Sequence, residues 1–245
     1  MDKVKLVIHQ NETYKKVAQI TLNSVQNLNA IDVDLYIELK KSLEIIKKRD
    51  DIGVLMITSE LTRAFSTGVN VKYIQTLTNK EASHFFQDLS NLLSELALLP
   101  IPTIALVNGY TFGAGADLAL ACDLRIASLS AVFRFPGPQF GLILGTQRLI
   151  NEVGPSAARY LTLTNTKVPA QKALTYGLIH EVCKDEKEGL ENLAKWADTM
   201  LNIPLQTAQQ LKQLCHTQQD FLPNLTKDSV LNGDFGKRFK HYLMK

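Results

Sequence analysis

The amino-acid sequence predicts an α/β protein. Runs of apolar and β-branched residues, typical of strands, alternate with segments whose apolar residues recur every three or four positions, as in helices. Strands that are separated by helices pair in parallel through crossover connections. With 245 residues, of which 45% are hydrophobic and 21% charged, the chain is long enough to bury one substantial core.

The first elements are two strands and a helix. "KLVIHQ" (5–10) and "VAQITLN" (17–23) have the β-branched content of strands, and a polar turn, "SVQNLNAID" (24–32), follows the second. Asp32 or Asp34 is placed to cap the next helix. Its apolar face is formed by Leu35, Leu39, Leu43 and Ile46.

The middle of the chain continues the alternation. "VLMITS" (54–59) is a continuous apolar run that predicts a buried strand. A helical pattern covers 80–97, and strands are expected in "IPTIALVNG" (101–109) and "LRIAS" (124–128). From about residue 155 onward the chain is predicted to be almost wholly helical.

Composition excludes several functional classes. A net charge of +3 and a pI near 8.6 allow an anionic small ligand but are too mild for a nucleic-acid-binding surface. Three widely spaced cysteines, Cys122, Cys183 and Cys215, contain no CxxC pair, which argues against a disulfide framework or a zinc site and favours a cytoplasmic location. Scattered histidines make a metal site improbable. The charged N-terminus lacks the apolar stretch of a signal peptide, and no segment has the length of a membrane span.

One stretch is unusually rich in small residues. "GYTFGAGADLAL" (109–120) follows a strand expected to end at Val107, and a helix is expected to begin near Gly113. Such a turn aims unpaired backbone N–H groups at a ligand. Leu118 occupies the third glycine position of a dinucleotide loop, no GK[ST] follows, and no G-x-S-x-G occurs. The stretch therefore predicts a site for an oxygen with developing negative charge.

A second stretch of this kind lies upstream. "TRAFSTGVNVKYI" (62–74) follows the strand at 54–59 and places Ser66, Thr67 and Gly68 before another helix. Two such turns could together hold one oxyanion, and each donor would contribute roughly 2.7–4 kcal/mol to the transition state.

Five segments, in this order, resemble the enoyl-CoA hydratase/isomerase (crotonase) family over nearly the whole chain. They are "ITLNSVQNLNAID", "RAFSTGVNVKYI", "VNGYTFGAGADLALACDLRIAS", "FPGPQFGLILGTQRL" and "ARYLTLTNTKVPAQKALTYGLIHEV".

The resemblance implies a fold, a substrate class and an assembly. Residues 1–190 would form a crotonase-like α/β spiral core of repeated ββα units, and 191–245 a helical C-terminal region used in trimerisation. The substrate would be an acyl-CoA thioester, with coenzyme A as part of the substrate and no separate cofactor or metal. A homotrimer or hexamer is expected, with neither nucleic acid nor membrane as partner.

The resemblance also assigns residues to roles. The backbone N–H groups of Val69 and Ala114 would hold the thioester oxygen. Coenzyme A would lie against Gln26, Leu28, Gly68, Lys72 and Gly113. Gln26 stands where the family often has a lysine, and three basic residues near the C-terminus could compensate: Lys237, Arg238 and Lys240.

The chain departs from the family where hydratases carry two glutamates. Asp117 stands at the first position and Gly137 at the second. The loop from Gly141 to Gly145 is about three residues shorter than in typical hydratases, which would reshape the acyl pocket. Val69 and Asn70 replace the usual Ala-Asp, a change that a backbone donor tolerates. Gln139, Tyr110 and Arg134 could fill the gap left by Gly137, although each also has a plain structural interpretation.

Asp117 is the predicted catalytic carboxylate. It follows Ala114 by three residues and so shares its helix face. Burial would raise the pKa of Asp117 and a helix N-terminus would lower it, and the sequence leaves both directions open. An acid in a first helical turn also commonly serves only the helix dipole.

A single carboxylate favours shifting a double bond over hydrating it. One base can remove a proton at one carbon and return it at another, whereas hydration is easiest with two groups. Two alternatives remain, a non-catalytic acyl-CoA-binding homologue and an acyl-CoA decarboxylase that relies on the oxyanion site alone.

Overall fold

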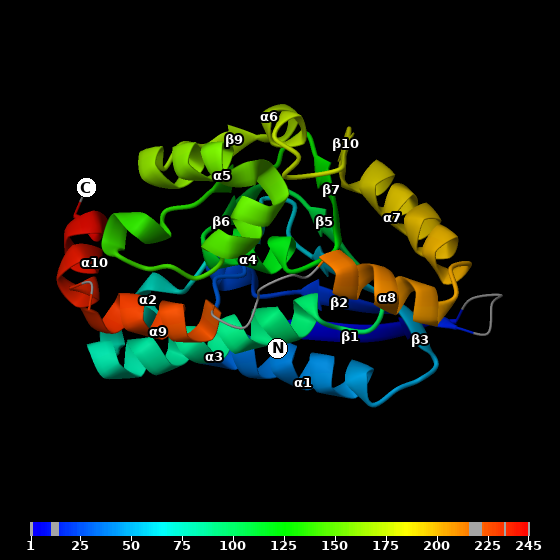
Figure 1. Ribbon diagram of the computed structural model, residues 1–245, viewed down its shortest axis with the longest axis horizontal. Coiled ribbons are helices and arrows are strands. Elements are labelled where there is room, and N and C mark those ends of the chain that lie inside the picture. The colour runs from blue at the N-terminus through cyan, green and yellow to red at the C-terminus, as the bar shows by residue number, and fades with distance from the viewer. Residues whose placement is uncertain (1, 11–14, 216–221, 233, 245) are drawn as a thin grey trace.

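The structure is a computed structural model that describes residues 2–10, 15–215, 222–232 and 234–244. It contains two β-sheets (Figure 1). The larger sheet has the order β1-β2-β3-β5-β7-β10, with bounds Val4–His9, Lys16–Leu22, Ile52–Ser59, Thr103–Val107, Leu124–Ser128 and Glu181–Cys183. The smaller sheet has the order β4-β6-β8-β9, with bounds Ala64–Ser66, Tyr110–Phe112, Val132–Arg134 and Val168–Pro169.

Parallel pairing dominates both sheets. In the larger sheet β2, β3, β5, β7 and β10 run parallel, and β1 pairs with β2 as an antiparallel hairpin. In the smaller sheet β4, β6 and β8 are parallel and β9 is antiparallel. The parallel pairing predicted for strands separated by helices is therefore confirmed.

The chain passes three times from the larger sheet to the smaller one and then into a helix. The first turn contains β3, β4, α2 (Val71–Thr76) and α3 (Asn79–Ala97). The second contains β5, β6 and α4 (Ala114–Leu120), and the third contains β7, β8 and α5 (Thr146–Thr164). This order is the predicted spiral of ββα units, and each turn brings the end of a short strand to the same side of the molecule.

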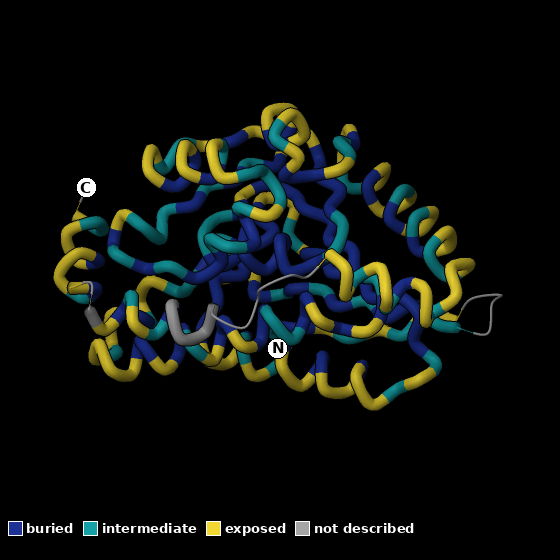
Figure 2. Tube along the Cα trace, in the orientation of Figure 1, coloured by how far each residue is buried: buried dark blue, intermediate teal, exposed yellow. Residues whose placement is uncertain are grey.

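Local sequence explains where the helices begin and bend. Asp32 caps α1 (Val33–Lys47) by accepting a hydrogen bond from the Leu35 N–H at 3.1 Å, so the cap is Asp32 and not Asp34. The predicted apolar face of α1 is buried in the core (Figure 2). Helix α5 is broken at Gly154, whose φ of 75° and the following Pro155 are incompatible with a continuous helix.

The C-terminal third is less helical than the sequence predicts. Strands β9 and β10 interrupt it, and at two and three residues they are too short to show a strand period. The helices there are α6 (Ala170–Thr175), α7 (Glu186–Leu201), α8 (Leu205–Cys215), α9 (Leu222–Asn232) and α10 (Phe235–Leu243).

The C-terminal helices return to the spiral. The boundary expected at residue 190 falls inside α7, which packs on β3, β5 and β7. Helix α9 lies along α3, and α10 packs against the short 3-10 helix η2 (Gly137–Phe140) (Figure 1). Another 3-10 helix, η1 (Val25–Asn27), follows β2. No described helix is long and apolar enough to cross a membrane.

Candidate active site

The two small-residue loops predicted from the sequence lie side by side. Gly68, after β4, has a φ of 94°, and Gly113, at the start of α4, has a φ of 48°, a region that L-residues with side chains rarely adopt. A Cβ at Gly68 would stand 2.8 Å from the Phe112 carbonyl oxygen and 3.6 Å from the Ala114 nitrogen. Position 68 therefore requires glycine for both its dihedral angle and its close approach to the second loop.

The loops present two backbone amides to one pocket. Ile31 N–H donates to the Gly68 carbonyl at 2.7 Å, and Asn70 N–H donates to the Ile31 carbonyl at 2.8 Å. Because backbone groups alternate in direction along an extended chain, the Val69 amide points away from Ile31. Ala114 is the first residue of α4, so its amide has no partner within the helix. Neither amide has an acceptor in the described part of the chain, and both residues line the pocket.

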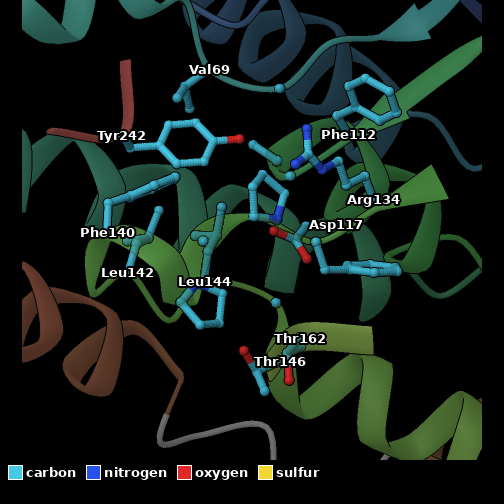
Figure 3. Close-up of a pocket in the computed structure, with 18 of the residues that line it drawn as sticks. Val69, Phe112, Asp117, Arg134, Phe140, Leu142, Leu144, Thr146, Thr162 and Tyr242 are labelled. Carbon is cyan, nitrogen blue, oxygen red and sulfur yellow. The ribbon is translucent and has the colours of Figure 1, made fainter. Parts of the chain in front are cut away.

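The pocket is a largely apolar cavity of about 200 Å³. One wall consists of the two loops, and the others come from the segment after β8, the loop before α5, and α10. Figure 3 shows the side chains that point into it. The apolar ones include Phe112, Phe135, Phe140, Leu142, Leu144, Leu149 and Phe239.

Asp117 is the only carboxylate among the described residues that line this pocket. It lies in the first turn of α4 and is buried. Burial raises the pKa of Asp117 to about 7, and the nearby Arg148 guanidinium opposes that rise. Of the two directions left open by the sequence, the upward shift of the Asp117 pKa is the one that burial produces here. A side chain at Gly145 would overlap the Asp117 carboxylate, so Gly145 provides the space in which the carboxylate lies.

Arg148, on α5, is the buried cation beside Asp117. It is 3% exposed, and its Nη2 donates to the Ser94 Oγ at 2.9 Å. Its Nε and Nη1 have no hydrogen-bond partner within the described residues. Loss of solvent lowers the pKa of Arg148 to about 10, and Asp117 opposes this change. No ion pair within 4.0 Å joins the two side chains in the described structure, so the attraction acts across a longer separation.

Gly137 lines the pocket but contributes no acid to it. A Cβ there would lie 2.9 Å from the Leu142 carbonyl oxygen, so the loop after η2 closes against the position where hydratases of the resembled family carry glutamate. Leu142 and Leu144 from this short loop point into the pocket (Figure 3). In place of a glutamate, this part of the pocket wall therefore consists of apolar side chains.

The predicted coenzyme-binding residues divide into two groups. Gly68 and Gly113 line the pocket, whereas Gln26, Leu28 and Lys72 do not. Gln26 and Lys72 are exposed and Leu28 is half-buried. The Leu28 carbonyl accepts a hydrogen bond from the Thr67 N–H at 3.2 Å, which ties the segment after η1 to the first loop.

A second, basic cavity of about 740 Å³ adjoins the pocket. Arg134 and Tyr242 line both cavities. Of the three basic residues considered as compensation for Gln26, Lys237 and Arg238 line the second cavity and Lys240 does not.

Among the residues considered for the gap left by Gly137, only Arg134 lies in the pocket wall. Tyr110 is 40% exposed, outside that wall, with its ring against Phe112. Gln139 is exposed and lines only the second cavity. Sequence analysis missed Arg148 and Tyr242. Nothing in their local patterns marks them, because only the tertiary fold brings them near Asp117 or the pocket.

Neither a metal site nor a disulfide is found in the described part of the chain. No group of three or more His, Cys, Asp or Glu side chains gathers there, and Cys122, Cys183 and Cys215 are free. Burial raises the pKa of the Cys122 thiol to about 12, so that thiol is inert at neutral pH.

Comparisons with known proteins extend this description. The family model for enoyl-CoA hydratase/isomerase matches residues 12–241. Over 196 residues the chain is 31% identical to crotonyl-CoA hydratase of Syntrophomonas wolfei, covering 78% of this chain and 74% of that protein. It is 30% identical over 186 residues to mouse mitochondrial methylglutaconyl-CoA hydratase, where the match covers 75% of this chain and 59% of the relative.

The fold has close counterparts among solved structures. The enoyl-CoA hydratase from Bacillus halodurans superimposes with a TM-score of 0.85 at 22% identity, covering 98% of this chain and 99% of that one. At this identity the likeness concerns the fold alone, and the predicted crotonase-like spiral is confirmed.

Proposed function

The chain belongs to the enoyl-CoA hydratase/isomerase family, and from this premise we propose that it forms the enolate of an acyl-CoA thioester and moves or hydrates a C=C bond. The observation that carries the proposal is a buried Asp117 in the same pocket as the free amides of Val69 and Ala114. A proton acceptor and two donors for a developing oxyanion are the groups that enolate formation requires.

The Val69 and Ala114 amides are proposed to hold the thioester oxygen. They need no reorganisation, because Gly68 and Gly113 set the chain direction before the substrate binds. Charge appears on the oxygen only as the α-proton leaves, so the donors stabilise the transition state more than the substrate.

Asp117 is proposed to move the α-proton. With a pKa of about 7, the carboxyl group is present near neutrality both as a base that can take a proton and as an acid that can return it. An exposed aspartate would be too weak a base for this step, so burial is the feature that suits Asp117 to it.

Isomerisation is favoured over hydration. Asp117 is the single carboxylate of the described lining and Gly137 adds none, which suits proton transfer between two carbons of one substrate better than activation of water. The curated relatives named above are hydratases, so hydration is the alternative product within the same proposal. Decarboxylation of a malonyl-type thioester needs only the oxyanion donors. A protein that only binds acyl-CoA would need neither those donors nor the Asp117 carboxylate.

The decisive experiment uses mass spectrometry in deuterated water. The protein and its Asp117→Asn variant are incubated with 2-enoyl-, 3-enoyl-, malonyl- and saturated acyl-CoAs. Deuterium uptake at the α-carbon that requires Asp117, together with migration or hydration of the double bond, supports the proposal. Equal uptake by variant and parent contradicts the role of Asp117. Binding of coenzyme A without any conversion indicates a binding protein, and loss of CO₂ in both forms indicates a decarboxylase.

The remaining sequence-based expectations stand as proposals. Coenzyme A is proposed to contact Gln26, Leu28 and Lys72 as well as the pocket glycines. A homotrimer or hexamer, built with the region 191–245, is testable by light scattering. The cytoplasmic location is proposed from the cysteine pattern alone, and fractionation of the source cells would test it.

A further inference from the structure

Asp117 is the one carboxylate in the described lining of the pocket, so with no other donor it would have to return at C4 the proton that it takes from C2, two carbons away. Besides Asp117, the polar side chains of the pocket are Thr67, Arg134, Thr146, Thr162 and Tyr242. The Thr162 hydroxyl donates to the Ala158 carbonyl at 2.8 Å, and the Thr67 hydroxyl lies 3.3 Å from the Leu28 carbonyl. A phenol releases a proton far more readily than an aliphatic alcohol or a guanidinium. Tyr242 is therefore the best proton donor in the wall besides Asp117.

Tyr242 is held so that its hydroxyl points into the pocket. Its ring packs edge to face on Phe140 at a centroid distance of 5.4 Å and an angle of 63°. Phe140 is fixed in turn by Phe235 and Phe239 of α10, at 5.8 Å and 5.2 Å. Figure 3 shows the Tyr242 hydroxyl directed to the interior of the pocket, away from the Phe140 ring. The aromatic cluster thus positions the phenol from its apolar end.

The same residue stands between the pocket and a cavity rich in basic side chains. Tyr242 and Arg134 line both spaces. The Arg134 Nε is held by the Asn165 carbonyl and Oδ1 at 3.2 Å and 3.0 Å, and its guanidinium also points into the pocket (Figure 3). The second cavity offers the Tyr242 hydroxyl a route to protons from water.

We propose that Tyr242 is a catalytic residue that delivers the second proton, replacing the carboxylate absent at Gly137. The proposal rests on the proposed enolate chemistry. The Asp117 carboxylate takes the C2 proton of a 3-enoyl thioester, and the electron pair spreads into the dienolate. The O–H bond of Tyr242 then breaks, and its proton forms a new C–H bond at C4. The double bond is left between C2 and C3. The Tyr242 phenolate then takes a proton from water, and protonated Asp117 gives its proton to the hydroxide that remains, so the net change is isomerisation.

The test separates enolate formation from delivery of the second proton. Tyr242→Phe keeps the ring that packs on Phe140 and removes only the hydroxyl. The matched control is Tyr36→Phe on α1, a half-buried tyrosine that packs edge to face on Phe85 and lies outside the pocket wall. For each protein, α-proton exchange of a saturated acyl-CoA in deuterated water is measured beside conversion of 3-enoyl- to 2-enoyl-CoA.

We expect Tyr242→Phe to exchange α-protons within twofold of the parent and to convert 3-enoyl-CoA about 100-fold more slowly, the usual contribution of a general acid. Tyr36→Phe should match the parent in both. Unchanged conversion by Tyr242→Phe overturns the proposal, because Asp117 then shuttles both protons. An equal loss of exchange and conversion also overturns it, since the hydroxyl would then serve the pocket structurally. Exchange without conversion by the parent overturns only the role of Tyr242, whereas no exchange by the parent overturns the proposed function as well.

Discussion

The groups proposed to act in the pocket are of two kinds. Two are backbone amides, at Val69 and Ala114 in the loops after β4 and β6, and glycines determine their directions. The others are the side chains of Asp117 and Tyr242, which line the pocket from α4 and α10, and of Arg148 on α5, which lies beside Asp117 but outside the pocket lining. A backbone donor survives a change of its own side chain, but a side-chain group does not. The departures from the family pattern accordingly matter for the side-chain groups and are mild for the backbone donors.

The largest effect that would sharpen this comparison is expected from Asp117→Asn. It should lower α-proton exchange by about 10²–10⁴-fold, the range for a positioned acid-base group. In the parent, exchange should increase with pH through a midpoint near 7, because burial raises the pKa of Asp117 to about 7 and only the ionised form accepts a proton. Asp34→Asn, an exposed acid on α1, is the control. A parent profile that is flat between pH 5 and 9 would argue against Asp117 as the base.

Among changes that affect the backbone donors, the largest effect is expected from Gly68→Ala. The added methyl meets the Phe112 carbonyl at 2.8 Å and the φ of 94° is strained, so the Val69 amide should move and exchange should fall by about 100-fold. Gly154→Ala is the matched control, because its φ of 75° carries similar strain with no atom within 4 Å. Both should lower the melting temperature, and only Gly68→Ala should also lower exchange. Equal activities of the two variants would contradict a role for the first loop.

Arg148→Met should shift the pH profile and keep the chemistry. Arg148 lowers the pKa of Asp117, so its removal should raise that pKa further, by roughly one unit for an opposite charge outside direct contact. Exchange at pH 6.5 should then fall about tenfold and recover at pH 9. Arg148→Lys should retain most of the parent profile. A loss that persists at high pH would show that Arg148 serves the fold of α5 instead of the charge of Asp117.

The smallest effect is expected from Val69→Ala. The substitution keeps the backbone N–H and removes two methyl groups from a partly buried side chain, so exchange should stay within about threefold of the parent. Steady-state rates with a saturated acyl-CoA would measure this. A large loss would mean that the Val69 side chain, and not its amide, is the functional group of the first loop.

The sequence predicts the backbone donors at Val69 and Ala114 better than it predicts the side-chain groups. Local signals that act within a few residues, such as the Asp32 cap and the positions of Gly68 and Gly113, led to the correct elements. The short strands β4, β6 and β8 to β10 were missed, because two or three residues show no period. Arg148 was missed since a charge in a helix usually faces water, and Tyr242 because its place depends on packing with Phe140. The pKa of Asp117 required burial to be known, and burial is a tertiary property.

The return of α10 to the pocket affects how the site is assembled during synthesis. Tyr242 lies more than a hundred residues after Asp117, and at ~5–20 residues per second the ribosome needs roughly ten seconds to make the intervening chain. During that interval the spiral can already bring the two loops together while Phe140 and Leu142 still lack the cover of Phe239 and Tyr242. The apolar residues of the pocket wall therefore stay uncovered in the nascent protein until α10 has been made.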